Sequence, residues 1–399
     1  MSFSLKPDQT LLEVTEMLPG SIPFFVGEGF PQMADEAKRR NFGARITLRQ
    51  ALKMKHLDFD AFCSRLEERI GEYASDADPA AEKIRVKGLL PCPVRIPLEE
   101  AFEEFSRDFS SRHKLEIETE FQAASVGAGW IAEHIESIKD PDEFPEIYIS
   151  AGFETFFDPE GIGKFREYFA DRSPEREINA SFRELGLEDP EGRYTMIAVV
   201  PAVFLVNTNE QGDRPMPQSW EDILQPEYEQ RVSLPVGDFD LFSGILLDIG
   251  KRYGDDGLRK LGRSLSESLH PAQMLTVGSR PKPPLVTIMP YFFTRMARPG
   301  SPMQAVWPSD GAIISPIFLL TKQAGSQHLQ EVIDFFSSQE CGEILGVKGL
   351  FPSTHPEVDN GLAPNSNFSW LGWDWISKTN IAEEIRRCER LFEEGRGAL

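Results

Sequence analysis

The alternation of short apolar runs with longer amphipathic stretches, which begins at Ile84, constrains the fold of this chain more than any other feature. The run at 84–90 is rich in strand-forming residues, and a helical pattern through Phe102, Phe105 and Phe109 follows it. The same order recurs further along the chain. Strands separated by helices predict a parallel sheet covered by helices, so we expect an α/β fold.

The remaining elements are expected in two successive α/β regions. Further strands are predicted at 115–118, 144–150, 194–207, 231–235 and 284–289, and an extended segment at 303–322. Further helices are predicted at 125–139, 241–253, 255–268, from about 291, at 324–337 and 339–346, and at 380–395. A chain of 399 residues is long for one core, so two or three cores are expected.

The first 70 residues predict a small all-α domain. Thr10 with Glu13, and Thr47 with Gln50, have the spacing of capping boxes at helix starts. The segments EMLPGSIPFFVGEGF and ITLRQALKMKHLDFDAFCSRLEE resemble a family of short uncharacterised helical domains found alone or fused to redox proteins in anaerobes. The segment 71–84, rich in Ala, Asp and Ser, predicts a linker.

Charge and composition limit the partners of the chain. The formal net charge of −22 would repel phosphate backbones and anionic membrane faces, so no nucleic-acid partner is expected. No apolar stretch approaches the ~18 residues that span a bilayer, and we expect no membrane insertion. The four cysteines are far apart without a CxxC pair, and we expect no metal site and no cofactor.

The N-terminus indicates where the chain acts. MSFSLKPDQT lacks the basic start and apolar core of a secretory signal. A cytoplasmic protein is therefore expected, and a periplasmic or extracellular one if an export signal was removed.

Three segments in order resemble the type II periplasmic solute-binding proteins, and are most similar to their ferric-iron class. They are PQSWEDILQPEY at 217–228, WPSDGA at 307–312 and VIDFFSSQE at 332–340. This resemblance implies a two-lobed body that holds a small molecule between its lobes. It implies lobe I at 85–198 and 308–375, lobe II at 199–307, and a separate C-terminal helix at 376–399.

In such a body the ligand is expected in the crevice at the carboxyl ends of the strands. That rule selects five loops, two of which open helices with backbone N–H groups suited to an anion. The predicted ligand-binding residues are Pro91, Cys92, Pro93, Ser125, Val126, Gly127, Ser150, Ala151, Gly152, Phe239, Asp240, Ser243 and Tyr291. Each of these loops can equally be a simple helix cap or core segment.

The resemblance to ferric-binding proteins implies two adjacent tyrosines near the last of these loops, which follows the strand predicted at 284–289. This chain has Tyr291-Phe292 there. Ferric iron prefers oxygen ligands, and Phe292 supplies none. An anionic or oxygen-rich organic molecule is therefore expected in place of iron.

Three functions are compatible with this sequence. The first is reversible solute binding by an intracellular sensor or carrier that closes about strands near 200–206 and 306–318, with residues 1–70 docking a protein partner. The second is an enzyme on the same scaffold that uses Cys92 as a nucleophile. The third is the receptor of a transporter.

Overall fold

The structure is a computed structural model of the whole chain, and it falls into two units, residues 1–82 and 83–399. The structure describes the following residues: 5–17, 21, 25, 30, 33, 39–55, 59, 62–63, 66, 83–123, 135, 138, 140–236, 239–268, 283–297, 300–323, 326 and 328–397.

The N-terminal unit has a small apolar core of its own, to which α1 (Leu11–Met17) and α4 (Leu48–Met54) contribute. The Thr47 side chain accepts from the Gln50 N–H while the Gln50 side chain accepts from the Thr47 N–H, so the predicted capping box is confirmed. Thr10 and Glu13 make the same reciprocal pair. These caps satisfy N–H groups that a helix start leaves without partners.

The larger unit is built on one ten-stranded sheet whose main path is β2-β1-β3-β9-β4-β7-β5-β6. Its strands are β1 (Ile84–Leu90), β2 (Ile117–Ala123), β3 (Ile147–Ala151), β4 (Thr195–Asn207), β5 (Val232–Leu234), β6 (Leu265–Ser268), β7 (Val286–Pro290), β8 (Met303–Val306), β9 (Ala312–Thr321) and β10 (Phe368–Ser369). The predicted α/β class is confirmed.

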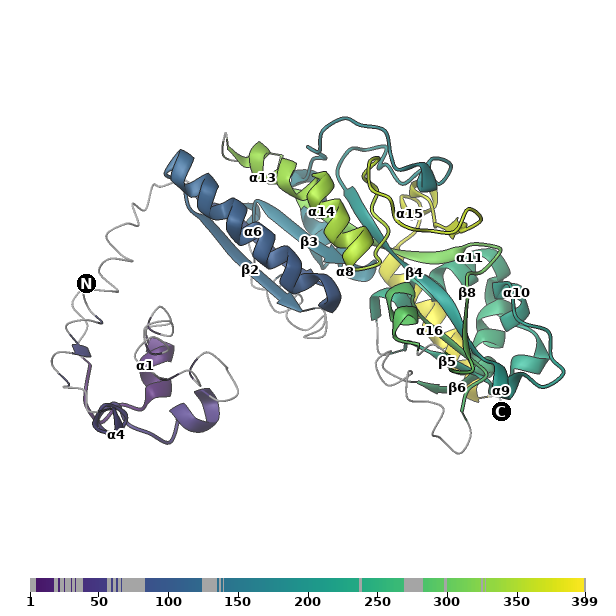
Figure 1. Cartoon of the computed structure of the whole chain (residues 1–399), viewed down its shortest axis with the longest axis horizontal. Helices are drawn as coiled ribbons and strands as arrows, with labels where there is room; N and C mark the ends of the chain where they lie inside the picture. The colour runs from purple at the N-terminus through teal and green to yellow at the C-terminus, as the bar shows by residue number, and fades with distance from the viewer. Residues whose placement is uncertain are drawn as a thin grey trace. The chain divides into compact units, whose positions relative to one another are not determined.

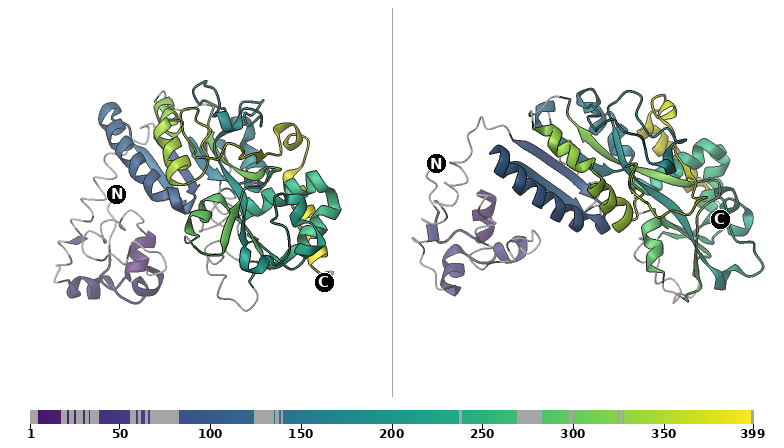
Figure 2. Two further views of the ribbon diagram at one scale, coloured as in Figure 1. Left: turned by 45° about the vertical axis from the view of Figure 1, so that its right-hand side comes forward. Right: turned by 45° about the horizontal axis from the view of Figure 1, so that its top comes forward.

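We call lobe I the half that carries β1, β2 and β3, and lobe II the half that carries β5, β6 and β7. Within each lobe these three strands are parallel. The long strands β4 and β9 pair antiparallel and continue from one lobe into the other (Figures 1 and 2). Both strands are buried at every residue, which explains their continuous apolar sequences.

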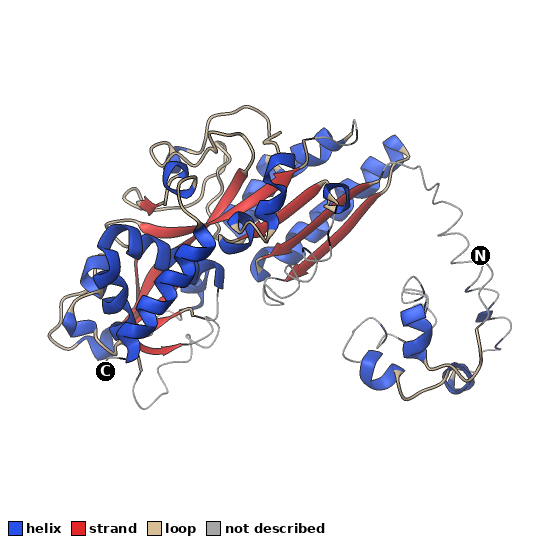
Figure 3. Cartoon of the chain, turned by 180° about the vertical axis from the view of Figure 1, so that it is seen from behind, coloured by secondary structure: helices blue, strands red, loops and turns tan. Residues whose placement is uncertain are grey.

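Helices cover both lobes. They are α6 (Cys92–His113), α8 (Glu154–Phe157), α9 (Thr208–Gln211), α10 (Trp220–Ile223), α11 (Phe239–Ser264), α13 (Leu329–Phe336), α14 (Gln339–Glu343), α15 (Trp373–Ile376) and α16 (Ile381–Gly397), with the short helices η6 (Ile162–Tyr168), η10 (Tyr291–Met296) and η11 (Ile344–Lys348). In lobe I, α6 runs along β2 beside α13 and α14 (Figure 1). In lobe II, α11 and α16 lie against each other, as the view from behind also shows (Figure 3).

The segment after β5 differs from the prediction. The expected break between two helices lies at Gly254, whose φ of 65° interrupts α11. The second helix was predicted to reach residue 268, and that is wrong, because 265–268 is strand β6. Pairing of β6 with β5 supplies backbone hydrogen bonds that outweigh the local helical pattern.

Helices α11 and α16 approach so closely that their backbones touch at two glycines. A Cβ on Gly262 would lie 2.0 Å from the Phe392 carbonyl oxygen, and one on Gly395 would lie 2.1 Å from that of Arg259. These contacts allow Phe392 and Cys388 of α16 to be buried in the core of lobe II.

Substitution of Gly262 by alanine is expected to destabilise the larger unit. Alanine gains about 1 kcal/mol in helix propensity. The clash with a backbone carbonyl forces α16 outward, at a cost of about 1–3 kcal/mol that we expect to exceed this gain. Denaturant unfolding measures the difference. Gly397→Ala is the matched control, because a Cβ there meets nothing within 4 Å; equal stability of the two variants would contradict the close contact.

Candidate functional site between the lobes

The carboxyl ends of strands from both lobes converge where β4 and β9 cross between them. Strand β3 ends at Ala151, opposite Ile317 of β9. Strand β7 ends at Pro290, opposite Ala202 of β4, which in turn lies opposite Ile313 of β9. Four residue steps of β9 separate the two meeting points, so they are offset by about 13 Å along that strand, and β3 and β7 reach the β9–β4 pair from opposite sides. This register brings three of the five predicted loops to one region.

The first of these loops follows β1. Gly88 of β1 lies opposite Ile149 of β3, so Leu90, where β1 ends, lies beside Ala151. Pro91 is the N-cap of α6, and its carbonyl accepts from the N–H groups of Val94 and Arg95. Proline suits this position because the first helical turn leaves N–H groups unpaired in any case. Cys92 begins α6, but its side chain lies outside the described part of the chain, and Pro93 is partly buried.

The loop after β3 is held by its own hydrogen bonds. The buried Ser150 hydroxyl donates to the Ala151 carbonyl at 3.1 Å. The Gly152 N–H donates to the Pro316 carbonyl of β9, also at 3.1 Å. Ala151 remains partly exposed. Gly152 therefore joins the end of β3 to β9, and the Ser150 hydroxyl is engaged within its own strand.

Helix α11 forms part of the lobe II side of the site. It begins at Phe239, and the side chains of Phe239 and Asp240 lie outside the described part. Ser243 is buried, with 4% of its surface exposed. A Cβ on the next residue, Gly244, would lie 3.1 Å from the ring of Phe153, directly after Gly152. The start of α11 therefore contacts the loop after β3.

The loop after β7 contacts both lobes. The Tyr291 ring packs edge-on against Trp307, with 5.2 Å between ring centroids. The Phe292 ring lies 5.1 Å from that of Phe351, which follows η11, a helix packed against α6 of lobe I. Phe292 therefore fills an apolar contact where a second tyrosine would supply a phenolate oxygen.

Sequence reasoning did not identify Ser315. It lies on β9 opposite Val200, midway between the two strand ends. It is 1% exposed, and its hydroxyl has no hydrogen-bond partner among the described residues. A buried hydroxyl without a partner is uncommon in native proteins. The signal available in the sequence was one polar residue inside the apolar run AIISPIFLL.

The loop of Ser125, Val126 and Gly127 falls outside the described residues, so its predicted place in the site stays a prediction. Two hollows of about 350 and 310 Å³ lie in lobe I, one beside Tyr194 and the other beside Thr195. Both are at the opposite end of β4 from Ala202, and neither is part of the converging strand ends.

Solved structures of several binding proteins have the same architecture as this chain. A periplasmic binding protein, AfuA from Actinobacillus pleuropneumoniae with bound fructose-6-phosphate, matches with a TM-score of 0.54 at 14% identity, covering 79% of this chain and 99% of that one. An ABC-transporter substrate-binding protein from Agrobacterium tumefaciens matches with a TM-score of 0.56 at 16% identity, covering 79% and 96%. Ferric iron-binding protein A from Mannheimia haemolytica, in an open conformation, matches with a TM-score of 0.51 at 13% identity, covering 79% and 99%. At these identities the matches establish the two-lobed fold.

The sequence comparisons identify the family. None of the curated proteins matches the chain. The family of bacterial extracellular solute-binding proteins matches residues 142–379, more than half of the chain. That description does not support the expected cytoplasmic location, and a protein partner of residues 1–70 stays a prediction. No helix among the described residues is long and apolar enough to cross a membrane. The chain shares the two-lobed fold of an ABC-transporter substrate-binding protein, and it belongs to the bacterial extracellular solute-binding protein family.

Proposed function

We propose that the chain reversibly binds a small anionic or oxygen-rich organic molecule at the converging strand ends, and that bending of β4 and β9 closes the lobes on it. The observation that carries this proposal is the register that brings the ends of β3 and β7 together at the crossing strands. Ligands of open α/β sheets bind outside the carboxyl ends of the strands.

Two long helices favour a ligand with negative charge. Helix α6 has 22 residues and begins where β1 ends, and the first part of α11, up to its break at Gly254, begins beside the loop after β3. The start of a helix carries partial positive charge. At α6 Pro93 has no N–H and the N–H groups of Val94 and Arg95 already donate to Pro91, so this partial charge, and not a set of free N–H groups, is what favours an anion there. The bound fructose-6-phosphate of the structurally similar AfuA makes a phosphorylated sugar a suitable first ligand to test.

Ferric iron is the less favoured ligand, although some structurally similar proteins are named for it. Its affinity depends on hard oxygen donors. Phe292 offers none, and its ring is packed against Phe351. The enzyme alternative depends on Cys92, whose side chain lies outside the described part of the chain, and it stays a prediction.

Native mass spectrometry of the freshly purified chain tests the proposal. A mass increase over the denatured chain that corresponds to an organic acid or phosphate ester would support it. Titration calorimetry with fructose-6-phosphate, inorganic phosphate and ferric citrate would then separate the ligand classes. Binding of ferric ion alone, or of neutral sugars as tightly as their phosphates, would contradict the proposed ligand class.

Substitution of Gly244 by leucine is expected to weaken ligand binding by about 10- to 100-fold, while the lobes stay folded. A Cβ alone would be 3.1 Å from the Phe153 ring, so a leucine side chain pushes the start of α11 away from the loop after β3. If the closed form becomes 10 to 100 times rarer, the apparent dissociation constant rises by about that factor.

Calorimetry with the ligand found in the native protein measures this effect. Asp256→Ala is the control, because Asp256 is exposed on the second half of α11 and pairs only with Lys260 among the described residues. A Gly244→Leu protein that binds as tightly as the Asp256→Ala protein would show that this contact does not limit closure.

A further inference from the structure

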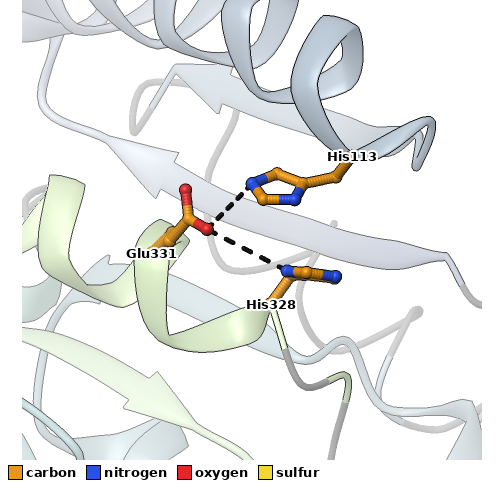
Figure 4. A group of neighbouring side chains, drawn as sticks. All are labelled: His113, His328 and Glu331. Carbon is orange, nitrogen blue, oxygen red and sulfur yellow. Dashed lines mark ion pairs between the residues drawn. The ribbon is translucent and has the colours of Figure 1, made fainter.

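Two histidines and a glutamate meet at the outer end of lobe I, where α6 ends and α13 begins (Figure 4). His113 is the last residue of α6, His328 is the N-cap of α13, and Glu331 lies in the first turn of α13. Nε2 of His113 is 2.8 Å from Oε1 of Glu331, and Nδ1 of His328 is 3.9 Å from the same oxygen. The two imidazole rings are 4.1 Å apart between centroids.

These distances suit a single metal ion. One donor atom from each side chain lies within 4.8 Å of the other two. Zinc binds imidazole nitrogen and carboxylate oxygen at about 2.0–2.2 Å, so two ligand atoms of a tetrahedral site are about 3.4 Å apart. The distances of 2.8 and 3.9 Å lie on either side of that value. Small side-chain rotations would therefore complete the geometry.

A neighbouring arginine orients the carboxylate. Nη1 of Arg112 is 2.6 Å from Oε2 of Glu331, and its Nε is 2.8 Å from Oδ2 of Asp108. The guanidinium thus binds one carboxylate oxygen of Glu331, and the other oxygen, Oε1, faces the imidazoles. Hydrogen bonds of this kind commonly orient the side chains that bind a metal. Asp108 balances the charge of Arg112, so the charge of Glu331 remains for a cation. Nη1 of Arg112 is also 3.0 Å from Nε2 of His113, and that contact must open when a metal binds.

We propose that His113, His328 and Glu331 bind one divalent transition-metal ion, of the class of Zn²⁺ or Ni²⁺, which joins α6 to α13. Two imidazoles favour such ions over Mg²⁺ and Ca²⁺, which prefer oxygen ligands. Three protein ligands leave a fourth position for water. The site is separate from the interlobe site, because the 22 residues of α6 place its two ends about 30 Å apart.

Calorimetric titration of the metal-stripped full-length protein with Zn²⁺ tests the proposal. We expect one equivalent to bind and the melting temperature to rise, because the ion joins two elements that are distant in sequence. Co²⁺ should give the visible absorption of a tetrahedral site with nitrogen and oxygen ligands. Mg²⁺ and Ca²⁺ should produce neither effect.

Three variants locate the ion. His113→Gln and His328→Gln are each expected to weaken Zn²⁺ binding by roughly 100-fold. Both side chains are partly exposed, so both variants should fold, and circular dichroism checks this. His355→Gln removes a histidine whose Nδ1 accepts from the Glu357 N–H, and it should bind Zn²⁺ like the native protein. Absence of Zn²⁺, Ni²⁺ and Co²⁺ binding, or binding unchanged in both variants, would overturn the site.

Discussion

Substitution of Arg252 by methionine is expected to lower the free energy of unfolding by about 3–5 kcal/mol at pH 7, because it leaves a buried carboxylate without its counter-charge. Arg252 lies on α11 and forms ion pairs with Asp248 and Asp310. The side chain of Asp248 is only 3% exposed, and its other oxygen accepts from the Ser369 hydroxyl at 2.6 Å. Methionine keeps the apolar stem of arginine, so the change removes the guanidinium with its charge and its hydrogen bonds.

The loss should depend on pH. Burial raises the pKa of the Asp248 carboxyl, and the charge of Arg252 opposes that rise. A carboxyl whose folded pKa lies above its unfolded value stabilises the folded state below the unfolded pKa, and this contribution is lost as the pH rises through the folded pKa. Without Arg252 the folded pKa rises further. The deficit of the Arg252→Met variant should therefore shrink as the pH falls from 7 toward 4.

Urea unfolding of both proteins at several pH values measures this. The matched control is the double variant Asp248→Asn/Arg252→Met, which removes the buried charge and keeps a group that can accept from Ser369. It should recover most of the lost stability, and with Asp248→Asn alone as the third variant the cycle gives the coupling energy of the pair. A double variant no more stable than Arg252→Met would mean that the lost contacts of Arg252 with Asp310, and not the unpaired charge of Asp248, account for the loss.

The parts of the fold that could be predicted from the sequence are those with strong local signals. The apolar run at 84–90 is β1, and the run predicted at 194–207 is β4 from 195 onward. The capping boxes at Thr10 and Thr47 are confirmed because a capping pair is complete within four residues. The extended segment at 303–322 appears as β8 and β9 on either side of a turn at Asp310-Gly311.

The features that could not be predicted depend on contacts between distant residues. Strand β6 forms because β5 lies beside it, and no pattern within 265–268 shows that neighbour. His113 and His328 are far apart in the sequence, although the centroids of their mutually tilted rings are 4.1 Å apart in the structure. The site was predicted only as a set of strand ends. The order of the strands, which brings Ala151 and Pro290 to the same crossing, required the structure.

Two of the segments that carried the family resemblance, 217–228 and 307–312, contact each other in the structure. The N–H of Trp220 donates to both oxygens of Asp310, at 3.1 and 3.2 Å. Its indole Nε1 donates to the Gly311 carbonyl at 3.0 Å. Gly311 has a φ of +100°, and a Cβ there would lie 2.7 Å from the Phe368 carbonyl carbon, so only glycine fits. The two segments form one joint that fixes the start of β9.

Substitution of Trp220 by alanine is therefore expected to cost about 3–5 kcal/mol of unfolding free energy, since it opens a large cavity in the core of lobe II. The indole is fully buried and packs edge-on against Phe204 of β4, with 5.0 Å between ring centroids. The change also leaves the Gly311 carbonyl without its donor, which adds to the cost. Denaturant unfolding followed by circular dichroism measures the total.

Trp220→Phe separates the two causes, because it keeps an aromatic ring against Phe204 and removes only the donor to Gly311. We expect it to lose about 1–3 kcal/mol, the cost of a buried acceptor left unpaired, with a smaller share from the reduced ring. If the joint also sets the path of β9, both variants should weaken ligand binding in proportion to the stability that they lose. A Trp220→Ala protein with native stability would show that 217–228 and 307–312 are held in place independently of each other.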